Sequence, residues 1–269
     1  MAGTCSVLRA TDEGGHPMTS VLSLLGRGAV AGAAAGLLSG GFSYLLVEPV
    51  IDRAVDLQAV HQAAEHTTAS AEIFSRSTQH IGLIVSATAV GLALGALFGV
   101  VYAFVHRRDP GTAAWTRSQH LAAAAFTGIW LLPFLRYPAN PPGVGDPGTI
   151  DQRTDFWLAA LGISLIAVVL AWNIHRRLAV RSAGAPARQL AVAGILIAAV
   201  AALFALPANP DAVTVPAKLL WEFRLWSVAT SVLLWGTLGL VFGLLGQRAG
   251  HLGGAAGPAV TAPAAGALV

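Results

Sequence analysis

The chain has 269 residues, of which 55% are hydrophobic and only 11% are charged, and its mean hydropathy is +0.66. A water-soluble domain needs a larger charged fraction to cover its surface, so this composition excludes an ordinary soluble protein and favours an integral membrane protein. The single cysteine, Cys5, excludes an internal disulfide and a cysteine-rich metal cluster.

Residues 1–27 form the first segment of the chain. This segment lacks a basic head and a small-residue cleavage site after its first apolar run, so it makes a poor signal peptide. We predict a cytoplasmic segment, and Met18 is an alternative start of the protein.

Six apolar stretches follow, and each is close to the roughly 20 residues that a membrane-spanning helix needs. They cover residues 28–47, 81–105, 119–135, 155–174, 189–206 and 225–245. We therefore predict an all-α integral membrane protein with about six transmembrane helices in one membrane domain, residues 28–246. Residues 247–269 are rich in Ala, Gly and Pro, and we predict a disordered cytoplasmic tail.

The charges divide unevenly between the two sides that these helices would define. One side carries ten basic residues against three acidic ones, and the other carries six basic residues against ten acidic ones. The ten are Arg9, Arg27, Arg107, Arg108, Arg117, Arg176, Arg177, Arg181, Arg188 and Arg248. The positive-inside rule places both termini in the cytoplasm. The basic residues flank helices without interleaved aromatics, which argues against nucleic-acid binding.

Glycines recur at every fourth residue in the first two stretches. The first stretch has Gly28, Gly32, Gly36 and Gly40, and the second has Gly91, Gly95 and Gly99. Small residues at this interval line one helix face and let two backbones approach closely within a bilayer. We predict a close hairpin of the first two spans.

The predicted external loop, residues 48–80, carries the most suggestive polar residues. Glu48 lies at the membrane edge beside a proline, where a carboxylate facing lipid would be costly, so it either lines a cation route or pairs with an arginine such as Arg136 or Arg153. Further along, His61 and Glu65 fall on one face if the loop is helical, and His80 ends it. Imidazole and carboxylate groups suit a divalent metal ion, although such pairs are also common on solvated helix faces.

A short motif occurs twice, because Pro138 to Pro141 and Pro207 to Pro210 both read Pro-Ala-Asn-Pro, 69 residues apart. The third and fourth spans thus resemble the fifth and sixth, which predicts a parallel repeat of two-helix hairpins. The two Pro-Asn segments would rim one outer vestibule with the amides of Asn140 and Asn209. The alternative is that each segment only stops a helix and makes a tight turn.

No motif of a known catalytic site is present, so we expect no enzymatic activity and no permanently bound cofactor. The chain has no Walker loop, no Gly-x-Ser-x-Gly and no His-Glu-x-x-His.

The segments "LLVEPVID" and "LLPFLRYPANPPGVGDPGTIDQRT", with the His/Glu-bearing loop and the glycine-rich second span, resemble the predicted cobalt-transporter subunit family CbtA over residues 20–246. The resemblance implies a multi-pass protein of the bacterial inner membrane that imports Co²⁺ with a small one-helix, histidine-bearing partner (CbtB-like). The resemblance carries over no ligand set, and from the residues themselves we expect the ions to gather at Glu48, His61, Glu65, His80, Asn140 and Asn209. The alternative function is a membrane scaffold that holds a partner subunit without conducting ions.

Overall fold

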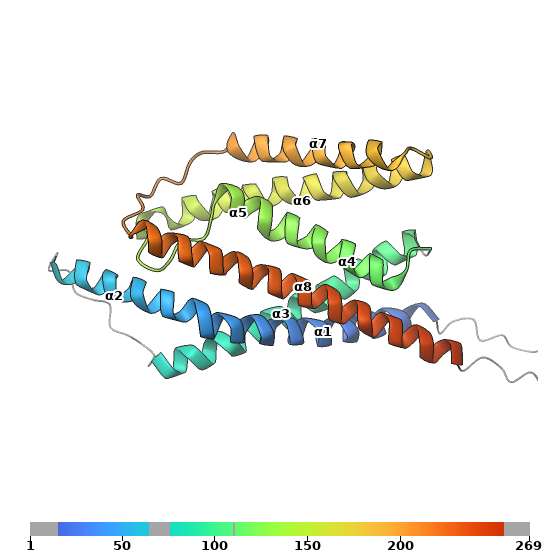
Figure 1. Ribbon diagram of the computed structural model, residues 1–269, viewed down its shortest axis with the longest axis horizontal. Coiled ribbons are helices and arrows are strands. Elements are labelled where there is room, and N and C mark those ends of the chain that lie inside the picture. Colours follow the sequence, from blue (N-terminus) through green and yellow to red (C-terminus); the bar gives the residue numbers. More distant parts are fainter. Residues whose placement is uncertain (1–15, 65–75, 110, 256–269) are drawn as a thin grey trace, which may run out of the picture.

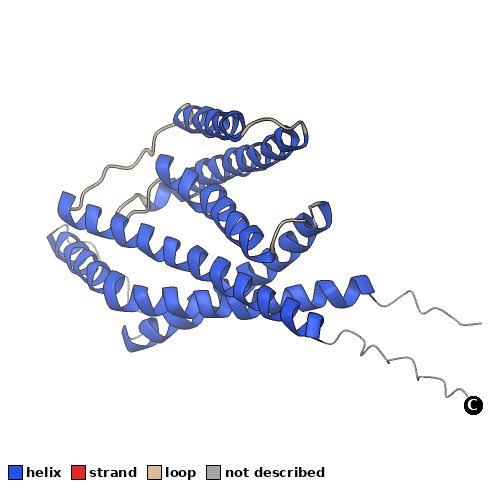
Figure 2. Ribbon diagram, turned by 45° about the vertical axis from the view of Figure 1, so that its right-hand side comes forward, coloured by secondary structure: helices blue, strands red, loops and turns tan. Residues whose placement is uncertain are grey.

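The computed structural model describes residues 16–64, 76–109 and 111–255, and every regular element in these ranges is a helix (Figure 2). The elements in chain order are α1 (His16–Phe42), η1 (Ser43–Val47), α2 (Glu48–Ala64), α3 (Arg76–Arg108), α4 (Ala114–Ala125), η2 (Phe126–Leu131), α5 (Leu132–Arg136), η3 (Pro147–Thr149), α6 (Ile150–Val180), α7 (Ala185–Phe204) and α8 (Ala217–Ala255). Five helical stretches are long and apolar enough to cross a membrane, which agrees with an all-α integral membrane protein.

These five stretches are Val21–Val60, Thr78–Arg108, Pro147–Val180, Ala185–Phe204 and Ala217–Ala249. The sixth predicted span, residues 119–135, is also helical, but it is built from α4, η2 and α5 and is not one of the five. α8 continues to Ala255, so residues 247–255 of the predicted disordered tail are helical. The segments 1–15 and 256–269, with the predictions made for them, lie outside the described residues.

The helices form an elongated bundle in which α1 and α3 lie along one edge and α6 and α7 along the other, with α4, α5 and α8 between them (Figure 1). The largest core cluster joins α1, α3, α4 and α8, where Phe98, Tyr102 and Phe242 stack edge to face or tilted. A smaller cluster around Leu132, Ala160 and Leu203 joins α5, α6 and α7.

The predicted hairpin of the first two spans is confirmed by the packing of α1 against α3. A Cβ atom added at Gly28 would meet the Gly95 carbonyl oxygen, and one at Gly32 would lie 2.8 Å from the Gly95 Cα. The glycines of α3 are equally tight, because a Cβ at Gly91 would lie 2.7 Å from the Gly36 Cα. The two backbones therefore touch directly, which only glycine permits.

The first span does not end at Val47 as predicted, because the helix continues through Glu48 and Pro49 to Ala64. A proline inside an α-helix lacks an N–H donor, and its ring clashes with the carbonyl four residues earlier. The π-helical turn η1 relieves this conflict, since the backbone N–H of Glu48 bonds to the Ser43 carbonyl five residues back. Where the structure describes the predicted loop 48–80, it is therefore helical.

The same solution occurs a second time at Pro133. The π-helical turn η2 ends two residues before this proline, as η1 ends two residues before Pro49, and the backbone N–H of Leu132 bonds to the Thr127 carbonyl. Both prolines are thus accommodated within helices that continue past them.

We expect Gly32→Ala to destabilise the protein by about 1–3 kcal/mol, the usual cost of forcing extra atoms into a packed contact. Gly41→Ala is the matched control on the same helix, because nothing lies within 4 Å of the Cβ it would add. Thermal unfolding in detergent checks the pair: the midpoint falls for Gly32→Ala and not for Gly41→Ala. Equal midpoints for both variants would contradict backbone contact at Gly32.

Candidate functional site

Glu48 is a buried carboxylate whose residue retains only 8% of its surface. It is the first residue of α2, directly after the π-helical turn, and the buried residues Val47 and Val50 lie on either side of it in the chain. A carboxylate withdrawn from water is tolerated only with a compensating partner. Its position therefore points to a specific interaction rather than to a solvated loop.

The partner that the structure places beside Glu48 is His80, in the first turns of α3. The Nε2 atom of His80 lies 3.2 Å from the Oε1 atom of Glu48, and the Tyr44 ring contacts the imidazole edge to face at 5.3 Å between centroids. Arg136 and Arg153, the alternative partners proposed from the sequence, bind elsewhere, to the Leu206 carbonyl and to Asp211.

The separation of the two atoms suits the chemistry of a shared cation. The Nε2 atom of His80 is shielded from solvent and has no hydrogen-bond partner among the described residues, so its contact with the carboxylate is an electrostatic one. Two neighbouring ligands of a small octahedral ion, each roughly 2.1 Å from the metal, are about 3 Å apart. Within the described ranges, no group of three or more His, Cys, Asp or Glu residues is arranged to hold a metal. The described residues thus offer two candidate ligands at this point, Glu48 and His80, and not a complete ligand set.

The other predicted ligands of the external loop are only partly described. His61 lies in α2 close to its end, and its side-chain position is outside the description. Glu65 lies wholly outside the described residues. Their assignment as metal ligands stays a prediction.

Hydrogen bonds join the neighbourhoods of the two Pro-Asn segments. The Tyr137 hydroxyl donates to the Pro207 carbonyl at 2.7 Å, and Arg136 donates to the Leu206 carbonyl at the same distance. Arg153 pairs with Asp211 at 3.1 Å, and the Thr149 hydroxyl also donates to this carboxylate. The first segment further rests on α2, since a Cβ at Gly143, whose φ is +80°, would touch Gln58.

Asn140 and Asn209 line one cavity of about 270 Å³ between these segments. The Oδ1 atom of Asn140 accepts a 3.0 Å hydrogen bond from Arg224, and that of Asn209 accepts one from the backbone N–H of Asp211 at 3.2 Å. Arg153 also lines the cavity. Amide oxygens that already accept hydrogen bonds, next to a guanidinium, suit a structural role better than cation binding.

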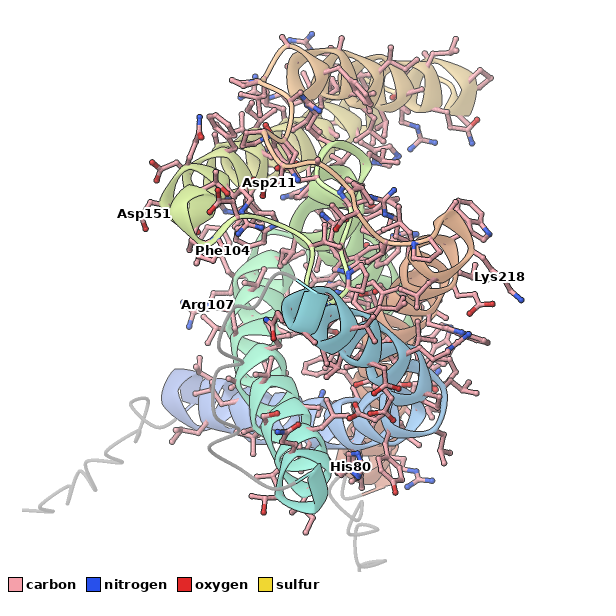
Figure 3. All side chains as sticks on the ribbon, turned by 90° about the vertical axis from the view of Figure 1, so that its left-hand side faces the viewer. His80, Phe104, Arg107, Asp151, Asp211 and Lys218 are labelled. Carbon is pink, nitrogen blue, oxygen red and sulfur yellow. The ribbon has the colours of Figure 1, made fainter. Side chains whose placement is uncertain are left out.

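The single outer vestibule expected from the sequence is thus resolved into two separate groups of residues. Figure 3 shows His80 and Asp211 far apart, and neither Glu48 nor His80 lines the cavity between the Pro-Asn segments. The pairing of His80 with Glu48 could not be predicted from the sequence, because it depends on the register of α3 against α1.

We expect Arg153→Gln to destabilise the protein by about 3 kcal/mol, because it leaves the Asp211 side chain, 5% exposed, as a buried charge without its cation. Asp211→Asn should cost less, since the Arg153 side chain is 30% exposed and can be hydrated. Thermal unfolding in detergent ranks the two variants. A larger loss for Asp211→Asn would show that the ion pair does not set the stability of these segments.

Comparison with known proteins gives one match. Residues 21–247 match the family model described as "Probable cobalt transporter subunit (CbtA)". No curated protein and no solved structure matches the chain.

Proposed function

Because the chain belongs to the family of probable cobalt transporter subunits (CbtA), we propose that it carries Co²⁺ inward across a bacterial inner membrane as the multi-pass subunit of a cobalt importer. The observation that carries the site assignment is the Glu48–His80 pair, a buried carboxylate and an imidazole nitrogen 3.2 Å apart. Carboxylate and imidazole ligands both suit Co²⁺.

The direction of transport rests on the predicted orientation of the chain. The charge distribution assigns the end that holds Glu48 and the Pro-Asn segments to the outside, and both termini to the cytoplasm. In Figure 1, the start of α1 and the end of α8 lie together at the opposite end of the bundle. With α4, η2 and α5 counted together as a sixth span, each successive crossing alternates in direction. We call the end with Glu48 the outer end.

The next polar groups inward from Glu48 are hydroxyls. Ser43, whose carbonyl accepts the Glu48 backbone N–H, places its Oγ atom 3.3 Å from the Thr230 Oγ1 atom of α8. The buried Ser39 follows one turn deeper on α1. Oxygen ligands in this order would replace part of the hydration shell of an ion that leaves Glu48.

Transport by a subunit implies a second component. The family description names a subunit, and we propose that a small one-helix, histidine-bearing membrane protein completes the importer. Histidines of that partner, together with His61 and Glu65, would add the ligands that Glu48 and His80 lack.

The test is uptake of radiolabelled Co²⁺ by cells that express the chain with its partner. We expect Glu48→Gln and His80→Ala each to raise the half-saturating Co²⁺ concentration by at least about tenfold, the loss typical of removing even an indirect partner of a bound metal. Thr230→Val should lower the maximal rate and leave half-saturation near the wild-type value.

Glu222→Gln is the matched control, because Glu222 is a second glutamate at the outer end and pairs with Arg53 at 2.8 Å. A surface ion pair of this kind contributes about 0–1 kcal/mol, so uptake should stay at the wild-type level. Quantified membrane abundance of each variant separates loss of transport from loss of protein. Wild-type uptake by both Glu48→Gln and His80→Ala would overturn the site, and uptake independent of the chain would favour the scaffold function.

A further inference from the structure

A cavity of about 570 Å³ lies at the inner end, between α4, α6 and α7. It is remote from Glu48 and His80, and the proposed transport does not use it. Its wall changes character along the helices. Polar residues gather near the helix ends, and aliphatic residues, among them Ala124, Val168 and Leu196, form the deeper part.

Two arginines line the polar part, and neither has a carboxylate within ion-pairing distance among the described residues. Arg117 is only 2% exposed and donates to the Tyr102 hydroxyl at 3.2 Å and to the carbonyls of Thr112 and Asp109. Arg176 donates to the Arg108 carbonyl at 2.7 Å. Both guanidinium groups are therefore held in place by neutral oxygens, and the one acidic group that acts on both of them, Asp109, lies beyond ion-pairing distance.

Arg117 also has an unused donor, because its Nε atom is buried and has no hydrogen-bond partner. A buried cation with an unsatisfied N–H costs free energy unless an anion or water reaches it. Arg117 is itself part of the cavity wall, so such a group would have room to approach.

One acidic group shares this wall. The Thr112 hydroxyl donates to the Asp109 carboxylate at 2.6 Å, which lowers the pKa of Asp109 and keeps it ionised. The polar part of the cavity thus holds two cations against one anion, together with His120 and His175. An anionic ligand gains from this balance, and a metal cation is repelled by it.

From this arrangement we propose that the cavity binds an anionic phospholipid of the inner leaflet, with the phosphate at Arg117 and Arg176 and an acyl chain along the apolar wall. Basic pockets between transmembrane helices on the cytoplasmic side are suited to acidic lipid headgroups. The volume and the gradient from polar to aliphatic lining fit one end of such a molecule.

The test is native mass spectrometry of the full chain purified in detergent, titrated with phosphatidylglycerol and, separately, with zwitterionic phosphatidylethanolamine. We expect phosphatidylglycerol to bind at least about tenfold more tightly, since each arginine near an acidic lipid contributes roughly fivefold. Arg176→Gln should lose about fivefold of this preference. Arg177→Gln, an exposed arginine next in the chain and outside the cavity wall, should keep it.

A second pair of variants tests the apolar wall. Ala124→Leu, which fills the cavity, should weaken phosphatidylglycerol binding, whereas Ala159→Leu, on an exposed position of α6, should not. Equal binding of the two lipids, or equal losses for Arg176→Gln and Arg177→Gln, would overturn the proposal. A third outcome would also overturn the proposal: millimolar inorganic phosphate displaces the lipid, and Ala124→Leu leaves lipid binding unchanged. The site would then hold a free anion only.

Discussion

The contact between the α1 and α3 backbones is the constraint on which the outer end of the bundle depends. Glycine faces on both helices hold the two axes close and fix their antiparallel register, with Gly28 beside Gly95 and Gly36 beside Ala87. Continued outward, the same register places Tyr44 against His80 and then Glu48 beside His80. In a bilayer no hydrophobic drive pulls helices together, so this direct contact is what makes the pairing of a carboxylate and an imidazole specific.

A second constraint acts at the prolines, and it explains which parts of the molecule the sequence predicts well. The glycine periodicity follows from close helix packing and the apolar stretches follow from contact with lipid, so both lead to correct expectations for α1, α3, α6, α7 and α8. The end of the first span was predicted wrongly at Pro49, because proline normally ends a helix. No local sequence pattern indicates that a π-helical turn accommodates this proline. The sequence therefore predicted a loop after Val47, but the helix continues there.

The candidate site shows the same limit. The parallel repeat inferred from Pro-Ala-Asn-Pro stays a prediction, although hydrogen bonds do join the neighbourhoods of the two segments, and the partner of the Asn140 amide comes from a distant part of the chain. Arg224 of α8 reaches Asn140, and Asp211 engages Arg153, contacts that depend on tertiary packing alone. Glu48 and His80 were both proposed as ligands, yet their pairing could not be read from a separation of 32 positions in the chain. The register between two helices decides which of their side chains meet, and this register cannot be read from a single sequence.

The continuous helix from Val21 to Val60 has a mechanical consequence. Its 40 residues span roughly 60 Å at 1.5 Å per residue, about twice the 30 Å of a hydrocarbon core, and the α2 part of this helix packs against the start of α8 through Val50, Ala54 and Leu219. The π-helical turn η1 directly precedes Glu48 in this helix. Because α2 packs against the start of α8, a shift of that end of α8 would move α2 and the Glu48 carboxylate with it, while the glycine contacts keep α1 against α3.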